Sequence, residues 1–232
     1  MLGVGVNTLA VIIGSLIGLL FKRGIPKKVA DAIMLGIGLC TLCIGISGIA
    51  AGGNILVSII SIVLGAVCGT LIDIDLRINN LAQAAAAKYK KKEHKEASQT
   101  SSASEGFIAA SLLFCVGSMT IVGSLNAGIS GNNEMLFTKS IMDFISSIML
   151  SASLGIGVLV SSAFVFVFQG AIALSAGFLQ PVLSEAIIME INCMGSVLII
   201  GLALNIIGIA KIKVANYLPA LLFTPLIAML FR

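Results

Sequence analysis

Three polar side chains with ligand or acid–base chemistry lie inside otherwise apolar stretches of the sequence: Asn7, Asp143 and Glu190. An ionisable group within a membrane-spanning segment costs free energy, so it needs a polar partner or a cavity. Two carboxylates, an amide and nearby hydroxyls offer the oxygen ligands that a hard cation such as Na⁺ prefers. The two carboxyls could instead share a proton. The residue types therefore leave Na⁺ and H⁺ both open and specify no metal.

Asp143 belongs to a polar stripe. Lys139, Asp143, Ser147 and Ser151 recur every four residues, which places them on one face of an α-helix. Such a stripe could line a cation path or a groove for a polar substrate. It could equally seal a helix–helix interface by hydrogen bonds, with Lys139 paired to Asp143. Both interpretations stay open at this point.

Glu190 is followed by Asn192 in a later apolar segment. At a rise of about 1.5 Å per residue, Asn7, Asp143 and Glu190 should lie at similar depths, roughly 9, 12 and 13 Å from one face. We therefore predict that they converge on one substrate- or ion-binding site. Its candidate residues are Asn7, Asp143, Ser147, Ser151, Glu190 and Asn192.

The elements that must position these residues follow from composition. Of the 232 residues, 58% are hydrophobic and 10% are charged, whereas soluble domains carry about 25% charge. Apolar runs of about 20 residues favour spanning helices, whose backbone groups bond within their own segment. We predict an all-α, polytopic membrane protein in which residues 1–232 form one integral membrane domain. About eight spans are expected, at 3–21, 29–49, 54–73, 106–125, 136–153, 156–176, 184–209 and 214–231. Residues 136–176 are the least clear, because only a Gly-Ile-Gly break argues for two crossings there.

The basic residues predict how these spans are oriented. With eight crossings, all of the 14 Lys and Arg residues except Lys139 and Arg232 share one face. Cytoplasmic loops attract Lys and Arg, so that face, with the basic loop 74–105, is predicted to be cytoplasmic. Both termini are then predicted outside. The lysines of this loop would lie near anionic lipid headgroups, and we expect no nucleic-acid role for them.

Two parts of the chain repeat one another. Leu2, Gly3, Gly5 and Val6 recur as Leu154, Gly155, Gly157 and Val158, and Pro26, Ile33, Met34 and Gly45 recur as Pro181, Ile188, Met189 and Gly201. The repeat predicts a first unit at 2–73 and a second at 154–232, joined through the 74–105 loop and a connecting helix pair at 106–153. An offset of five crossings turns the second unit upside down, as in carriers built from inverted repeats. Close helix packing is the alternative reason for such glycines.

Four of these glycines, Gly3, Gly5, Gly155 and Gly157, are candidate hinges or breaks. A broken helix would aim its backbone groups at a substrate. Frayed helix ends at the membrane surface are the alternative for the first pair.

Three stretches resemble a known family: GVGVNTLAVIIGSLIGLLFKRGIP, FCVGSMTIVGSLNAGISGN with KSIMDFISSIMLSASLGIGV, and EINCMGSVLIIGLALNIIGI. They are similar to the DUF554 family of bacterial inner-membrane proteins, of the YqgA and YdfK type. The resemblance covers nearly the whole chain and implies a multi-pass protein of the bacterial inner membrane. It carries over no activity.

The leading functional hypothesis is a secondary carrier or channel-like transporter for a small solute or ion, with Na⁺ or H⁺ as candidate coupling ions. The alternative is a non-transporting scaffold or sensor that acts through the basic loop. No nucleotide-binding, hydrolase or zinc-protease motif occurs, so we predict no enzyme and no cofactor. Expected partners are the lipid bilayer, the small solute or ion, and further copies of the chain in a homo-oligomer.

Overall fold

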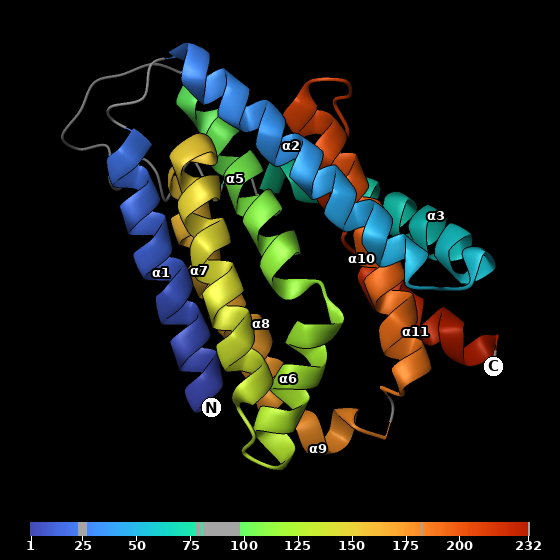
Figure 1. Cartoon of the computed structure of the whole chain (residues 1–232). Coiled ribbons are helices and arrows are strands. Elements are labelled where there is room, and N and C mark those ends of the chain that lie inside the picture. The colour runs from blue at the N-terminus through green and yellow to red at the C-terminus, as the bar shows by residue number, and fades with distance from the viewer. Residues whose placement is uncertain (23–26, 78–79, 81–97, 182, 232) are drawn as a thin grey trace.

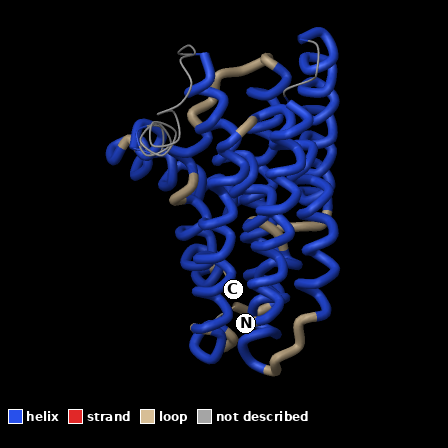
Figure 2. Tube along the Cα trace, turned by 90° about the vertical axis from the view of Figure 1, so that its left-hand side faces the viewer, coloured by secondary structure: helices blue, strands red, loops and turns tan. Residues whose placement is uncertain are grey.

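The structure is a computed structural model that describes residues 1–22, 27–77, 80, 98–181 and 183–231. These residues form helices joined by short loops, without strands (Figure 2). In chain order the elements are α1 (Leu2–Lys22), α2 (Lys27–Ala50), α3 (Ile55–Ile72), α5 (Ser98–Cys115), α6 (Ser118–Ile129), α7 (Glu134–Leu154), α8 (Ile156–Leu174), α9 (Ala176–Leu179), α10 (Glu185–Ile207), the 3-10 helix η2 (Val214–Tyr217) and α11 (Ala220–Leu230).

Within the described residues, six helices are long and apolar enough to cross a bilayer: α1, α2, α3, α7, α8 and α10. The prediction of an all-α polytopic membrane protein is confirmed. Residues 136–176 form two helices, which meet at Gly155, whose φ is +80°. Two of the eight predicted spans, at 106–125 and 214–231, are not single long helices in the described part of the chain.

The predicted span at 106–125 is bent. Helices α5 and α6 meet at an angle of 59° and count as one further span only if taken together (Figure 1). The predicted span at 214–231 consists of η2 and the 11-residue α11, which contains Pro225. At about 1.5 Å per residue, α11 alone is too short to cross a bilayer.

One group of helices consists of α1, α5, α6, α7 and α8, and we call it the α1/α7 bundle. Gly3 packs against Leu136, Gly14 against Phe144 and Gly18 against Ile148. The residue numbers rise together along this contact, so α1 and α7 are parallel. In the same way, Gly157 packs on Ala103 and Gly128 on Ala173, so the bent α5–α6 segment runs parallel to α8.

The other group consists of α2, α3, α10, η2 and α11, and we call it the α2/α10 group. Here the pairs are antiparallel, because Gly38 packs against Ile207 and Gly45 against Ile200. The same applies to α3, whose Gly65 and Gly69 pack against Ala220 and Asn216. Glycines on α2 and α3 thus let the partner backbones approach closely.

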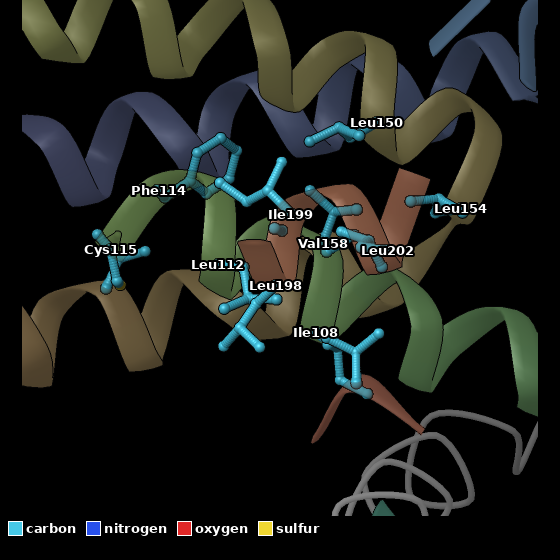
Figure 3. Close-up of a cluster of buried hydrophobic side chains, with 14 of the residues drawn as sticks. Ile108, Leu112, Phe114, Cys115, Leu150, Leu154, Val158, Leu198, Ile199 and Leu202 are labelled. Atoms are coloured by element: carbon cyan, nitrogen blue, oxygen red, sulfur yellow. The ribbon is translucent and has the colours of Figure 1, made fainter. Parts of the chain in front are cut away.

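The largest apolar core joins the two groups. It contains buried side chains from α5, α7, α8 and α10, such as Leu112, Leu150, Val158 and Leu202 (Figure 3). The outward faces of α2 and α3 carry many exposed large apolar side chains, as lipid-facing or subunit-facing helices would.

The chain termini and two of the helix ends lie toward opposite ends of the molecule in the view of Figure 1. Both termini lie in the lower half of the molecule, whereas α1 ends and α10 turns into η2 at the upper end (Figures 1 and 2). Lys211 and Lys213 belong to that upper turn. The lysine run of the predicted 74–105 loop, at residues 88–95, falls outside the described residues. The cytoplasmic assignment of the upper side stays a prediction.

Candidate functional site

Asp143 lies near the middle of the 21-residue helix α7 and uses both of its carboxylate oxygens. Lys139 Nζ donates to Oδ1 at 2.8 Å, one helical turn away on α7. Asn7 Nδ2 on α1 donates to Oδ2 at 3.0 Å. The Lys139 and Asp143 side chains are only 9% and 6% exposed, so the pair is a buried, neutralised charge at the α1–α7 interface.

The upper part of the predicted polar stripe serves that interface. Ser147 Oγ donates to the Phe144 carbonyl at 2.8 Å, and Ser151 Oγ donates to the Ser15 carbonyl of α1 at 2.9 Å. The facing residues on α1 are Gly14 and Gly18, spaced four apart as in close helix pairs. Ser147 and Ser151 therefore follow the interface interpretation, while Asp143 one turn below also has a side-chain partner on α1.

Apolar side chains lie one or two helical turns above and below Asp143 and its partner on α1. Below it, Val4, Ala127, Leu136 and Ala173 form one buried cluster, and above it Val11, Leu150 and Val165 belong to the main core. On α1, α7 and α8, Asn7, Asp143 and Gln169 lie about midway between these two sets. With Lys139, and with Ser124 of α6, they form what we call the polar layer.

The polar layer contains atoms without partners. Asn7 Oδ1, both polar atoms of the Gln169 amide and Ser124 Oγ are buried and accept or donate no hydrogen bond within the described part of the chain. All three side chains are fully buried. A buried polar group without a hydrogen bond costs about 1–3 kcal/mol in proteins, and natural structures rarely leave several together.

Gln169 and Ser124 were not among the predicted site residues. The signal that could have found Gln169 is the one that found Asn7, an amide inside the apolar run VFVFQGAIAL. Ser124 gave no comparable signal, because serine is common in apolar helices and bonds readily to its own helix.

Glu190 lies in the α2/α10 group and has a different kind of partner. Its Oε1 and Oε2 both accept the backbone N–H of Asn54, at 2.8 and 3.0 Å. Asn54 is the N-cap of α3, and the preceding Gly52 and Gly53 have φ values of +116° and +153°. The carboxylate thus fixes the tight turn between α2 and α3.

Asn192 also lies in this group, beside Gly48 of α2, and its carbonyl accepts a hydrogen bond from Ser196 Oγ at 2.7 Å. The structure therefore brings Asn7, Asp143 and the two serines together. Glu190 and Asn192 contact α2 and the α2–α3 turn instead.

The predicted hinge glycines have distinct places. Gly3 and Gly5 lie inside the unbroken α1, where Gly3 N donates to Asn133 Oδ1 at 2.8 Å and fixes the start of α1 to the α6–α7 turn. Gly155 joins α7 to α8, and Gly157 packs against α5. The bend between α5 and α6 lies at Gly117 instead. There Thr120 Oγ1 of α6 donates to the Phe114 carbonyl of α5 at 2.9 Å.

In the described ranges, no three His, Cys, Asp or Glu side chains come together as metal ligands would. A pocket of about 380 Å³ opens at the upper end, between α5, the end of α10 and the turn that follows it. Its lining carries both signs of charge: Asp75, Glu105, Lys211 and Lys213. It lies outside the polar layer.

Comparisons with known proteins agree with a membrane protein. The chain is 33% identical over 231 residues to the uncharacterized membrane protein YdfK of Bacillus subtilis (strain 168). The matched part covers 98% of this chain and 95% of that protein. It is 28% identical over 221 residues to the uncharacterized protein YqgA of Escherichia coli (strain K12), over 95% of this chain and 93% of that protein. No solved structure matches. Residues 2–229 match the family described as "Protein of unknown function (DUF554)", and the chain belongs to this family.

Proposed function

We propose that this protein is a transporter, either a secondary carrier or channel-like, for a small solute or ion, with Na⁺ or H⁺ as candidate coupling ions. The observation that supports it is the polar layer. A buried ion pair and several unpartnered polar atoms lie across α1, α6, α7 and α8, between apolar side chains above and below. Polar groups inside a membrane bundle are costly and mark solute or ion pathways.

The packing of the α2/α10 group supports a carrier built from two inverted units. Gly45 is the repeat partner of Gly201. A Cβ on Gly45 would lie 2.6 Å from a side-chain carbon of Ile200, the residue just before Gly201. Gly65 of α3 packs against Ala220 of α11, and these two residues are as many positions apart in the sequence as Gly45 and Ile200. Contacts between equivalent positions are what a two-fold axis between oppositely oriented units would produce. Such units can open a central site to alternate sides.

A proteoliposome uptake screen, run with and without Na⁺ and pH gradients, tests the proposal. We expect at least one small solute or ion to accumulate faster than in protein-free liposomes, and Asp143→Asn to lower that rate at least tenfold. Glu134→Gln is the matched control, since Glu134 is an exposed acid at the start of the same helix. A folded wild-type protein that moves nothing, or an Asp143→Asn variant that transports normally, would contradict the proposal.

A further inference from the structure

The unpartnered atoms of the polar layer lie on sides of their helices that face one another. Gln169 is one turn below Val165 and one turn above Ala173, both buried in the α1/α7 bundle. Ser124 is one turn above Gly128, where an added Cβ would collide with the Ala173 carbonyl oxygen. Because α6 and α8 are parallel, Ser124 and Gln169 lie at the same level of this contact.

Asn7 joins this level from α1. It lies between Val4, which belongs to the same small cluster as Ala173, and Val11, which belongs to the same core as Val165. Its Nδ2 is used by Asp143, so its Oδ1 is left as an acceptor. Three helices therefore direct unpartnered amide or hydroxyl groups into one buried level of the bundle.

The chemistry of these atoms selects against ions. The Asp143 carboxylate is already neutralised by Lys139 at 2.8 Å, so a cation would have to displace an internal ammonium group. What remains is neutral: Asn7 Oδ1 and Gln169 Oε1 accept, Gln169 Nε2 donates, and Ser124 Oγ can do either. A cation could bind the oxygens, but it would leave the Gln169 Nε2 donor unsatisfied and would add an uncompensated charge to the layer. A ligand that satisfies all four atoms carries both acceptors and donors, and an uncharged one keeps the layer neutral.

We propose that the polar layer binds a small neutral solute with both hydrogen-bond donors and acceptors, of the size of an amide, urea or a polyol, between Asn7, Ser124 and Gln169. This inference rests on the proposed transport function and names its substrate class. The Lys139–Asp143 pair positions Asn7 through its Nδ2 and keeps the layer electrically neutral.

The test uses the full chain in proteoliposomes and stopped-flow light scattering after an inward gradient of one solute. The neutral probes are urea, acetamide and glycerol, and millimolar guanidinium serves as a charged probe of nearly the shape of urea. We expect at least one neutral probe to enter faster than it enters protein-free liposomes, and guanidinium to enter no faster.

The decisive variant is Gln169→Leu, which keeps the side-chain size and removes the amide. Neutral-solute entry should fall at least fivefold, and Ser124→Ala should lower it by a smaller factor. The matched control is Ser162→Ala, because the Ser162 hydroxyl is also buried on α8 but already donates to the Leu159 carbonyl at 2.6 Å. Its entry rate should stay within twofold of wild type.

Three results would overturn the inference: guanidinium entering in preference to urea, a Gln169→Leu protein with the wild-type rate, or neutral probes entering no faster than without protein. If another solute or ion is still transported and depends on Asp143, the proposed function stands and only the substrate class fails. If neither assay detects any transport, both fail together. A gel-filtration profile and a melting curve for each variant separate loss of the amide from loss of the fold.

Discussion

Asp143 and Glu190 are both acids within apolar helices, yet the structure gives them opposite surroundings. Asp143 contacts two side chains, Lys139 and Asn7, in a layer that retains unpartnered polar atoms. Glu190 contacts one backbone N–H of a tight turn and has the geometry of a structural clamp. A costly intramembrane acid is therefore no sufficient sign of a transport site. The partner that the acid contacts, and the unpartnered groups around it, separate the transport role proposed for Asp143 from the structural contact of Glu190.

The largest expected effect comes from breaking the ion pair of the polar layer. Lys139→Met leaves the Asp143 carboxylate buried without a counter-ion, which should cost about 3–5 kcal/mol of unfolding free energy. The measurement is reversible unfolding in mixed micelles, followed by circular dichroism. The double variant Lys139→Met with Asp143→Leu removes both charges and should recover most of the loss. A double variant as unstable as the single one would show that the pair is not the source of the effect.

The next effect concerns α1, which holds Asn7 against Asp143. A Cβ at Gly14 would come within 2.5 Å of the Phe144 carbonyl oxygen, so Gly14→Ala should separate α1 from α7 and cost about 1–3 kcal/mol. Gly5→Ala is the matched control on the same helix, because nothing lies within 4 Å of its new Cβ. The control should be neutral or stabilising by up to about 1 kcal/mol, the helix propensity of alanine over glycine. Equal destabilisation of both variants, measured as melting temperatures, would remove the packing argument.

Several features of the fold could be predicted from the sequence, because apolar length and period are local properties. The spans predicted at 3–21, 54–73 and 156–176 match α1, α3 and α8 closely. The bend at Gly117 could not be predicted, since the chain there stays apolar and a single glycine is compatible with a helix. The short α11 was predicted to be longer because hydropathy does not register the 3-10 turn before Pro219.

The candidate site was predictable only in part, for a geometric reason. Distance along a helix gives the depth of a residue, so Asp143 and Glu190 were predicted at one level. Depth does not specify which helices are neighbours, and tertiary packing puts Asp143 against α1 but Glu190 against the α2–α3 turn. The pairing of Lys139 with Asp143 could be proposed from the sequence as one of two interpretations, because both residues lie on one helix at a spacing of four.

A smaller effect tests the clamp role of Glu190. Glu190→Gln keeps an oxygen that can accept the Asn54 N–H, so it should cost only about 1 kcal/mol, the difference between a charged and a neutral acceptor. Transport of any identified solute should stay within twofold of wild type, as measured in proteoliposomes. A loss of transport as large as that of Asp143→Asn, at unchanged stability, would place Glu190 in the site together with Asp143.

The smallest expected effect separates the polar layer from the interface directly above it. Ser147 donates to the carbonyl of Phe144 on its own helix and lies against Gly14. Because this hydrogen bond stays within one helix, it contributes little to the stability of the α1–α7 interface. Ser147→Ala should change the unfolding free energy by less than about 1 kcal/mol and leave transport unchanged. If Ser147→Ala lowers transport as Gln169→Leu is expected to do, the serine hydroxyls belong to the solute path. The site would then extend upward along α7, because only a polar face that the solute contacts would respond to so small a change.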